Sequence, residues 1–261
     1  MLEDSTPATH KNKRHKALVL TRYKYMQTVR QVMAELKKLG SEQMRKTYAR
    51  HGITENCFGV KIADMKVIVK KIKGNQDLAL ALYDTGNYDA MYLAGLAADG
   101  ALMTKKQLDS WAKNAKWAML SEYTVAWVAV ESPHACDLAI QWMKSKKELI
   151  QVSGWSTYSF MTANRPDEEL DLDEIKELLD RVANEIDDAL NLTRYVMNAF
   201  VIAVGSYVKP LTKKAKQIAK KIGQVEVDMG DTACKVPLAT EYIAKVEKAG
   251  RLGKKRSTVK C

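Results

Sequence analysis

Helical periodicity runs through nearly the whole of this 261-residue sequence. In Gly59–Lys73, the residues Met65, Ile68, Val69 and Ile72 follow the spacing of a buried helix face, and lysines occupy the opposite face. Similar segments follow one another between short turns, and none shows the strict alternation of a strand. Only 5 prolines and 13 glycines interrupt the chain. The sequence therefore predicts an all-α protein whose helices stack as antiparallel pairs in a repeat array.

The predicted array divides the chain into an arm, one domain and a tail. Residues 1–16 are polar and basic without periodicity, which predicts a flexible basic arm. Residues 17–250 are predicted to form a single helical solenoid domain, and residues 251–261 a basic tail without an acid. A stacked array of helix pairs curves, so its concave face offers a groove to an elongated ligand. A double helix would fit this groove, and so would a helix of another protein.

Charge is distributed unevenly along the chain. The segment Asp167–Asp188 holds eleven acids against Lys176 and Arg181. Because that segment contributes −9 to a total of +11, the other residues carry +20. Five lysines also cover one face of the predicted helix 213–222, at 213, 214, 216, 220 and 221. This distribution favours a polyanionic partner, with phosphate contacts that weaken as salt increases.

Composition argues against several other classes of protein. The four cysteines are far apart and form no CxxC or Cys/His cluster, so we expect no metal site and no cofactor. The N-terminus lacks the apolar core of a signal peptide. The most apolar run, Tyr195–Val208, is too short to span a bilayer and predicts a buried helix. We expect a cytoplasmic monomer without membrane contact.

The segment WAKNAKWAMLSEY (111–123) combines aromatic and basic residues. Trp111 and Trp117 are separated by Lys113 and Lys116. Aromatic rings interleaved with lysines are typical of surfaces that stack on sugars or bases between phosphate contacts. Alternatively, the two tryptophans anchor successive helices in the core, with the lysines facing solvent.

Three stretches together resemble one family, the AlkD-like HEAT-repeat DNA glycosylases of DNA alkylation repair. They are FGVKIADMKVIVKKIKGNQDLALALYDTGNYDAMYLAGLAAD, MTKKQLDSWAKNAKWAMLSEY and TRYVMNAFVIAVGSYVKPLTKKA. The resemblance implies a HEAT-like α-solenoid with a basic concave groove that binds double-stranded DNA. It also implies excision of cationic N3- or N7-alkylpurines, in which a carboxylate, tryptophans and an arginine stabilise the developing sugar cation. Members of this family do not need to flip the lesion into a pocket, unlike other glycosylases.

The residues of the family's active site carry over only in part. Trp117 falls at the position of the first active-site tryptophan, but Ser121 stands where the resemblance implies the catalytic aspartate. Glu122 is adjacent, although one residue turns a helix by about 100°. In the helix of the family's arginine, Trp155 and Tyr158 are found instead. The resemblance thus points to a divergent branch that lacks the usual catalytic aspartate.

Three hypotheses follow from these patterns. In the first, Glu122 supplies the missing carboxylate and the chain excises alkylpurines. In the second, the chain is a solenoid that binds nucleic acid without catalysis. In the third, it is an interaction scaffold for an acidic protein. The residues predicted to contact DNA are Trp155, Tyr158, Arg194, Asn198, Lys209, Lys213, Lys216 and Lys220. Asp231 and Thr232, in a non-helical segment, are predicted as turn or capping residues.

Overall fold

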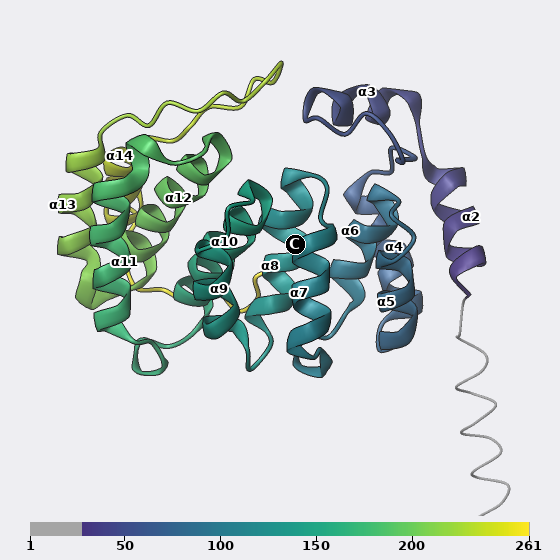
Figure 1. Cartoon of the computed structure of the whole chain (residues 1–261), viewed down its shortest axis with the longest axis horizontal. Helices are drawn as coiled ribbons and strands as arrows, with labels where there is room; N and C mark the ends of the chain where they lie inside the picture. Colours follow the sequence, from purple (N-terminus) through teal and green to yellow (C-terminus); the bar gives the residue numbers. More distant parts are fainter. Residues whose placement is uncertain (1–27, 261) are drawn as a thin grey trace, which may run out of the picture.

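The computed structural model describes residues 28–260, and every regular element in that range is helical (Figure 1). The α-helices are α2 (Val29–Leu39), α3 (Glu42–Arg50), α4 (Ile62–Ile72), α5 (Gln76–Tyr83), α6 (Tyr88–Ala97), α7 (Lys105–Asn114), α8 (Ala126–Val130), α9 (Ala135–Met143), α10 (Glu148–Asn164), α11 (Leu172–Glu185), α12 (Asn191–Tyr207), α13 (Thr212–Ile222) and α14 (Ala239–Lys248). The predicted all-α array is confirmed. The predicted arm, residues 1–16, lies outside the described residues.

Short helical turns complete the set of elements. They are η1 (Gly100–Leu102), η2 (Leu120–Val125), η3 (Asp167–Glu169), η4 (Ile186–Asp188) and η5 (Lys209–Leu211). Of these, η2 is π-helical and leads directly into α8. The sequence predicts a helix from Trp117 to Val130, and the structure is helical from Ala118 to Val130, with the π-helical turn inside this helix. The helix predicted as His134–Met143, after the start signal Ser132-Pro133, begins one residue later, at Ala135.

Most helix starts follow from local side-chain chemistry. The hydroxyl of Ser41 accepts a hydrogen bond from the backbone N–H of Met44 at the start of α3. Asn75 and Asn87 begin α5 and α6 in the same way. Thr104 and Gln107 form a reciprocal capping box at the start of α7. These caps satisfy N–H groups that would otherwise lack partners, and they fix the turns between helices.

A continuous row of helices forms the interior of the array. Along it α6 packs on η2, η2 and α8 pack on α10, and α10 packs on α12 (Figure 1). The helix α12 is buried along most of its length, from Thr193 to Ser206, as its apolar composition predicts. The wall formed by α10 and α12 carries the site described below.

Close packing of α9 against α10 depends on Gly154. A Cβ atom added there would lie 2.7 Å from the carbonyl oxygen of Ala139 and 2.8 Å from the backbone nitrogen of Met143. We expect Gly154→Ala to lower the free energy of unfolding by about 1–3 kcal/mol, because two backbones would have to separate. Urea denaturation measures this change. Within a loosely packed helix the same substitution would instead stabilise the protein by about 1 kcal/mol, and that sign would contradict the prediction.

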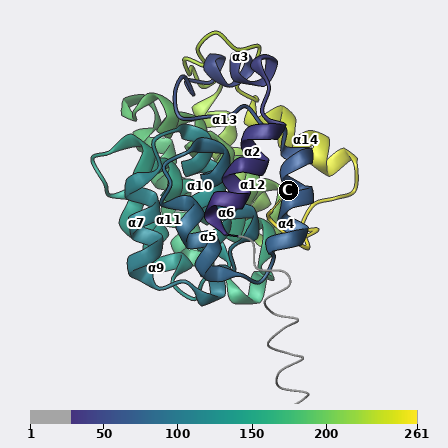
Figure 2. The same ribbon diagram turned by 90° about the vertical axis from the view of Figure 1, so that its right-hand side faces the viewer.

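The segment 223–238 is a long loop that connects α13 to α14. It reaches from the C-terminal end of the array to α3, and both views place the two close together (Figures 1 and 2). A Cβ atom added to Gly230 would lie 3.6 Å from the carbonyl oxygen of Arg50. The backbone N–H of Cys234 donates to the hydroxyl of Thr232, which confirms Thr232 as a turn residue.

The last residues of the chain return across the array as a strap, which we define as residues 251–260. The backbone N–H of Gly253 donates to the carbonyl of Ser206 near the end of α12, over 2.9 Å. Lys255 then reaches the carbonyl of Thr162 in α10, and Lys260 reaches the carbonyl of Ala98 after α6. Positive side chains are favourable at helix C-termini, where carbonyl groups lack partners. The tail, predicted only as basic, therefore ties three inner helices together.

Candidate functional site

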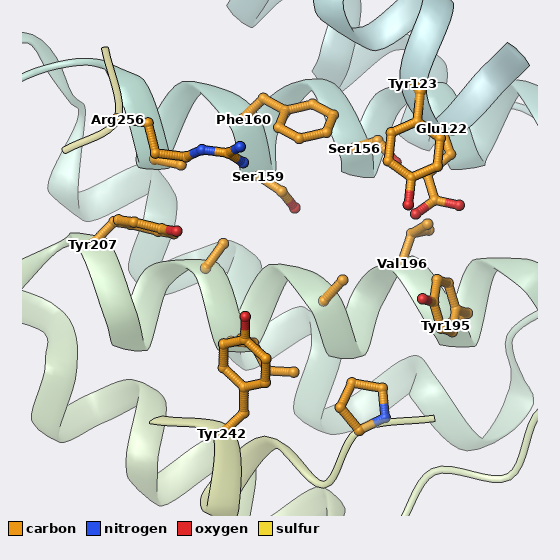
Figure 3. Close-up of a pocket in the computed structure, with 15 residues that line it drawn as sticks. Glu122, Tyr123, Ser156, Ser159, Phe160, Tyr195, Val196, Tyr207, Tyr242 and Arg256 are labelled. Carbon is orange, nitrogen blue, oxygen red and sulfur yellow. The ribbon is translucent and has the colours of Figure 1, made fainter. Parts of the chain in front are cut away.

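A pocket of about 290 Å³ opens between α10 and α12 (Figure 3). The helical turn η2 forms one end, and the strap and α14 contribute the rest of the wall. Five aromatic residues and two charged residues surround it, namely Tyr123, Phe160, Tyr195, Tyr207, Tyr242, Glu122 and Arg256. Smaller residues of α10 and α12, including Ser156, Ser159 and Ala199, form the floor. A pocket with aromatic walls and few polar groups is typical of a ligand site.

The π-helical turn η2 decides which of its side chains enter the pocket. Ser121 is fully buried against the core, whereas Glu122 and Tyr123 line the pocket. The turn lies close to α6, since a Cβ added to Gly95 would come within 2.6 Å of the Thr124 side chain. Single π-helical turns occur often at functional sites, because they redirect side chains without breaking the helix. A glutamate adjacent to the position of the family aspartate thus gains access to a cavity.

Burial governs the protonation of this end of the pocket. It raises the pKa of Glu122 from 4.5 to about 7, while a hydrogen bond from the Tyr123 hydroxyl acts in the opposite direction. Burial, and then the nearby Glu122 carboxylate, also raises the pKa of Tyr195 to about 12. Near neutral pH Glu122 is therefore divided between an acid that donates a hydrogen bond and a carboxylate that accepts.

The opposite end of the pocket is cationic and more open. Figure 3 shows the guanidinium of Arg256 directed toward Ser159 and Phe160 of α10, with Tyr207 of α12 facing it. Tyr242 of α14 keeps 48% of its surface exposed at the rim. Such an exposed ring is an available stacking surface. The pocket thus runs from a titratable carboxyl to a guanidinium between aromatic side chains.

The aromatic residues singled out from the sequence occupy other places. Trp117 is 7% exposed and packs edge-on against Tyr88, with ring centroids 5.6 Å apart. Trp111 stacks on Tyr83 at 3.9 Å. The core-anchor interpretation of both tryptophans is therefore correct, and the stacking surface predicted for them is wrong. Both rings fill space between successive helices, where no ligand reaches them.

The structure also corrects the predicted contact of Trp155 and Tyr158 with DNA. Both lie in α10 with 1% of their surface exposed, and both pack against Phe200 of α12. The hydroxyl of Tyr158 donates to the carboxylate of Glu174. Side chains buried this far offer almost no area to a deoxyribose, although Trp155 borders a second cavity and is covered there by Arg181. They belong to the layer between α10 and α12, which supports the pocket from behind.

Asn198 and Arg194, predicted as groove residues of α12, differ in their surroundings. Asn198 is 1% exposed and donates from its side-chain nitrogen to the carbonyl of Pro237, over 2.9 Å. It therefore anchors the end of segment 223–238 and offers DNA no contact. Arg194 is partly buried, and its Nε has no hydrogen-bond partner among residues 28–260. Its contact with DNA stays a prediction.

The lysines predicted to bind phosphate lie around the C-terminal end of the array. In α13, which forms that end in Figure 1, Lys213 and Lys220 are exposed. Lys216 pairs with Glu247 of α14 at 2.6 Å, so its charge is partly neutralised. Lys209 is exposed beside the strap, close to Gly253. The lysine face is thus on the end helix, and the pocket lies deeper in the array.

Sequence patterns did not reveal most residues of the pocket. Tyr207, Tyr242 and Arg256 carry no motif, and they come from α12, α14 and the strap. The sequence signal was weak: tyrosines on an otherwise apolar helix, and a tail with Arg256 in its centre. No three His, Cys, Asp or Glu side chains within 28–260 are arranged to hold a metal ion. In the same range no helix has the length and apolarity needed to cross a bilayer.

Comparison with known proteins identifies the family. The model of the DNA alkylation repair enzymes matches residues 32–222. The chain belongs to the DNA alkylation repair enzyme family. Two uncharacterized proteins, from Listeria monocytogenes and Listeria innocua, are each 34% identical to it over 226 residues, covering 84% of this chain and 97% of each relative.

A solved structure extends the family likeness to three dimensions. It is 41% identical to this chain, superposes with a TM-score of 0.84, and covers 90% of this chain and 100% of its own. That protein is described as one of a new family related to the HEAT-like repeat DNA glycosylases, with affinity for branched DNA structures. This DNA alkylation repair family member therefore has the HEAT-like fold expected from its sequence. The range matched by the family model ends before segment 223–238 and before the strap.

Proposed function

We propose that this protein binds DNA, prefers branched DNA to a continuous duplex, and does not excise alkylated bases. The observation that carries the proposal is the likeness, over the full length of the other chain, to a protein with affinity for branched DNA. The charge of +11, with the acids concentrated in segment 167–188, supports contact between the rest of the chain and phosphates. Exposed Lys213 and Lys220 are available for such contacts.

The absence of excision rests on the position of the family's aspartate. Ser121 occupies it, is fully buried, and its hydroxyl has no hydrogen-bond partner among the described residues. A neutral, sealed side chain cannot stabilise a developing sugar cation. Loss of such a positioned charge typically costs about 3–4 kcal/mol of transition-state stabilisation. The family's tryptophan position is no more accessible, because Trp117 is also buried.

Binding by fluorescence anisotropy tests the first part of the proposal. We expect a four-way or three-way junction to bind at least about tenfold more tightly than a duplex of equal length, a difference of about 1.4 kcal/mol. Affinity for both should fall as salt increases from about 50 to about 200 mM. Equal affinities for junction and duplex would contradict the preference for branches. No salt-dependent binding to either would contradict DNA binding altogether and favour the scaffold for an acidic protein.

Excision by Glu122 is a second candidate function, favoured by the position of this carboxyl in an aromatic pocket. Release of 7-methylguanine and 3-methyladenine from alkylated DNA distinguishes it from binding alone. Under the main proposal, the protein releases no more base than buffer does. Enzyme-dependent release that disappears in Glu122→Gln would establish the second candidate instead. The release measured with Ser121→Ala is the matched control, because the Ser121 side chain does not reach the pocket.

A further inference from the structure

The strap holds Arg256 firmly by its backbone while leaving its side chain unengaged. The backbone N–H of Arg256 donates to the carbonyl of Ala163 over 2.8 Å, and its own carbonyl accepts from the side chain of Asn164 over 2.9 Å. The preceding Lys255 pairs with Asp167 at 2.7 Å. By contrast, the guanidinium makes no hydrogen bond or ion pair with residues 28–260 and points into the pocket (Figure 3).

A guanidinium that has no acidic partner, carried on a backbone held by two hydrogen bonds, is suited to bind an anion. Arginine presents a planar fork of donors that matches a phosphate, and its charge persists at all physiological pH values. Two other cations of the strap, Lys255 and Lys260, are each paired with an acid, at Asp167 and Glu131. Arg251, Lys254 and Arg256 form no ion pair with residues 28–260, and of these three cations Arg256 is the one that lines the pocket.

The walls of the pocket have the dimensions and chemistry for a planar group next to that anion. Aromatic side chains flank the space between Arg256 and Glu122, and Figure 3 shows them on opposite sides of it, from α10, α12 and α14. The volume of about 290 Å³ lies near the lower end of the range of about 300–1,000 Å³ for small-ligand pockets. Bases stack on such rings whatever their sequence. At the far end, Glu122 can exchange hydrogen bonds with the edge of a base.

We propose that the pocket binds one unpaired nucleotide of a DNA strand, with its base between the aromatic side chains and its phosphate on Arg256. The inference rests on the proposed function, because branch points are among the places where unpaired nucleotides occur in DNA. An unpaired base enters a pocket without the cost of breaking a base pair. The strap thereby supplies a binding residue that lies beyond the range matched by the family model, which ends at residue 222.

Junctions labelled with 2-aminopurine test this inference. One three-way junction carries an unpaired 2-aminopurine nucleotide at the branch, and a second is fully paired. We expect the wild type to bind the first about tenfold more tightly and to change the fluorescence of its 2-aminopurine, since stacking on aromatic rings alters it. Arg256→Gln should lose that advantage, while Arg256→Lys, which keeps the charge without the fork, should retain part of it.

Arg251→Gln is the matched control, because it removes the same charge from an exposed position of the same strap. It should weaken both junctions equally and by less than about threefold, as the loss of one phosphate-attracting charge would. The Arg256→Gln variant keeps both backbone hydrogen bonds of this position, and an unchanged melting temperature verifies that the strap stays in place. Equal losses in Arg256→Gln and Arg251→Gln, or equal binding of the two junctions by the wild type, would overturn the inference.

Free 2-aminopurine deoxynucleoside monophosphate separates the inference from the proposed function. If the wild type binds neither junction but binds this mononucleotide through Arg256, the proposed function fails and the pocket assignment stands. Alternatively, the wild type binds junctions, but Arg256→Gln changes neither the advantage of the unpaired nucleotide nor the binding of the mononucleotide. In that case the pocket assignment fails and the proposed function stands.

Discussion

Replacement of Asp89 by alanine is expected to lower the free energy of unfolding by about 3–5 kcal/mol, the usual cost of breaking a buried, charged hydrogen-bond network. Asp89 lies in the first turn of α6 with no exposed surface. Its carboxylate accepts hydrogen bonds from the backbone N–H groups of Phe58, Gly59 and Val60, at 2.5, 3.2 and 2.8 Å. Alanine would leave all three donors without this acceptor, and those of Gly59 and Val60 are buried.

The same loop is held from two other directions. The Tyr48 hydroxyl donates to the carbonyl of Val60 over 2.6 Å, and the backbone N–H of Tyr88 donates to the carbonyl of Asn56 over 2.8 Å. A Cβ on Gly59 would lie 2.6 Å from the carbonyl oxygen of Ser41. Loss of the Asp89 carboxylate therefore affects the junction of α3, α4 and α6 together, and the cost should be large.

Asp77→Ala is the matched control for Asp89→Ala. Asp77 occupies the equivalent first-turn position of α5, also after an asparagine cap, but its side chain is exposed. We expect a loss below about 1 kcal/mol there, the usual contribution of an exposed acid to the helix dipole. Urea denaturation of both variants gives the comparison. Similar losses at the two positions would show that the loop contacts contribute little.

The free energy of unfolding should decrease with pH across the titration of Glu122. Burial raises its pKa in the folded protein from 4.5 to about 7, so between these values the folded state holds more protons than the unfolded state. Stability from this group is then fully present below about pH 4.5 and is lost progressively as pH rises toward 7. At about 1.4 kcal/mol per pH unit, the loss amounts to about 3 kcal/mol at most.

Glu122→Gln isolates this effect, because glutamine fills the same space and does not titrate. Between about pH 5 and about pH 8, we expect the unfolding free energy of the wild type to fall by about 2–3 kcal/mol relative to that of Glu122→Gln. Other titrating groups, including Asp89, contribute equally to both proteins and cancel. Parallel pH profiles of the two proteins would mean that the Glu122 carboxyl titrates normally.

A neutral Glu122 also changes what the pocket can bind. Below pH 7 the protonated carboxyl donates a hydrogen bond, whereas above it the carboxylate repels a phosphate and accepts from donors on a base. The same titration would weaken Glu122 as an electrostatic stabiliser of a sugar cation near neutral pH. This agrees with a pocket used for binding rather than for excision.

Local sequence signals determined the helices and their limits. The capping residues Ser41, Asn75 and Thr104, the apolar stripe of α4 and the all-round apolarity of α12 depend only on neighbours along the chain. They predicted α4 within residues 59–73 and α13 to within one residue of 213–222. The family resemblance likewise rests on stretches of contiguous sequence, and the matching family model confirms it.

The site depended on contacts that local patterns do not contain. A tryptophan such as Trp117 has the same sequence signature in a core or at a binding surface, and only packing against Tyr88 decides that it is buried. The π-helical turn that places Glu122 at the pocket packs closely against α6 at Gly95, which is distant in the sequence. Arg256 reaches α10 from 92 residues away through Asn164. The sequence by itself determined which segments are helical, because that choice is made within a few residues, whereas the tertiary structure alone decided which side chains share a pocket.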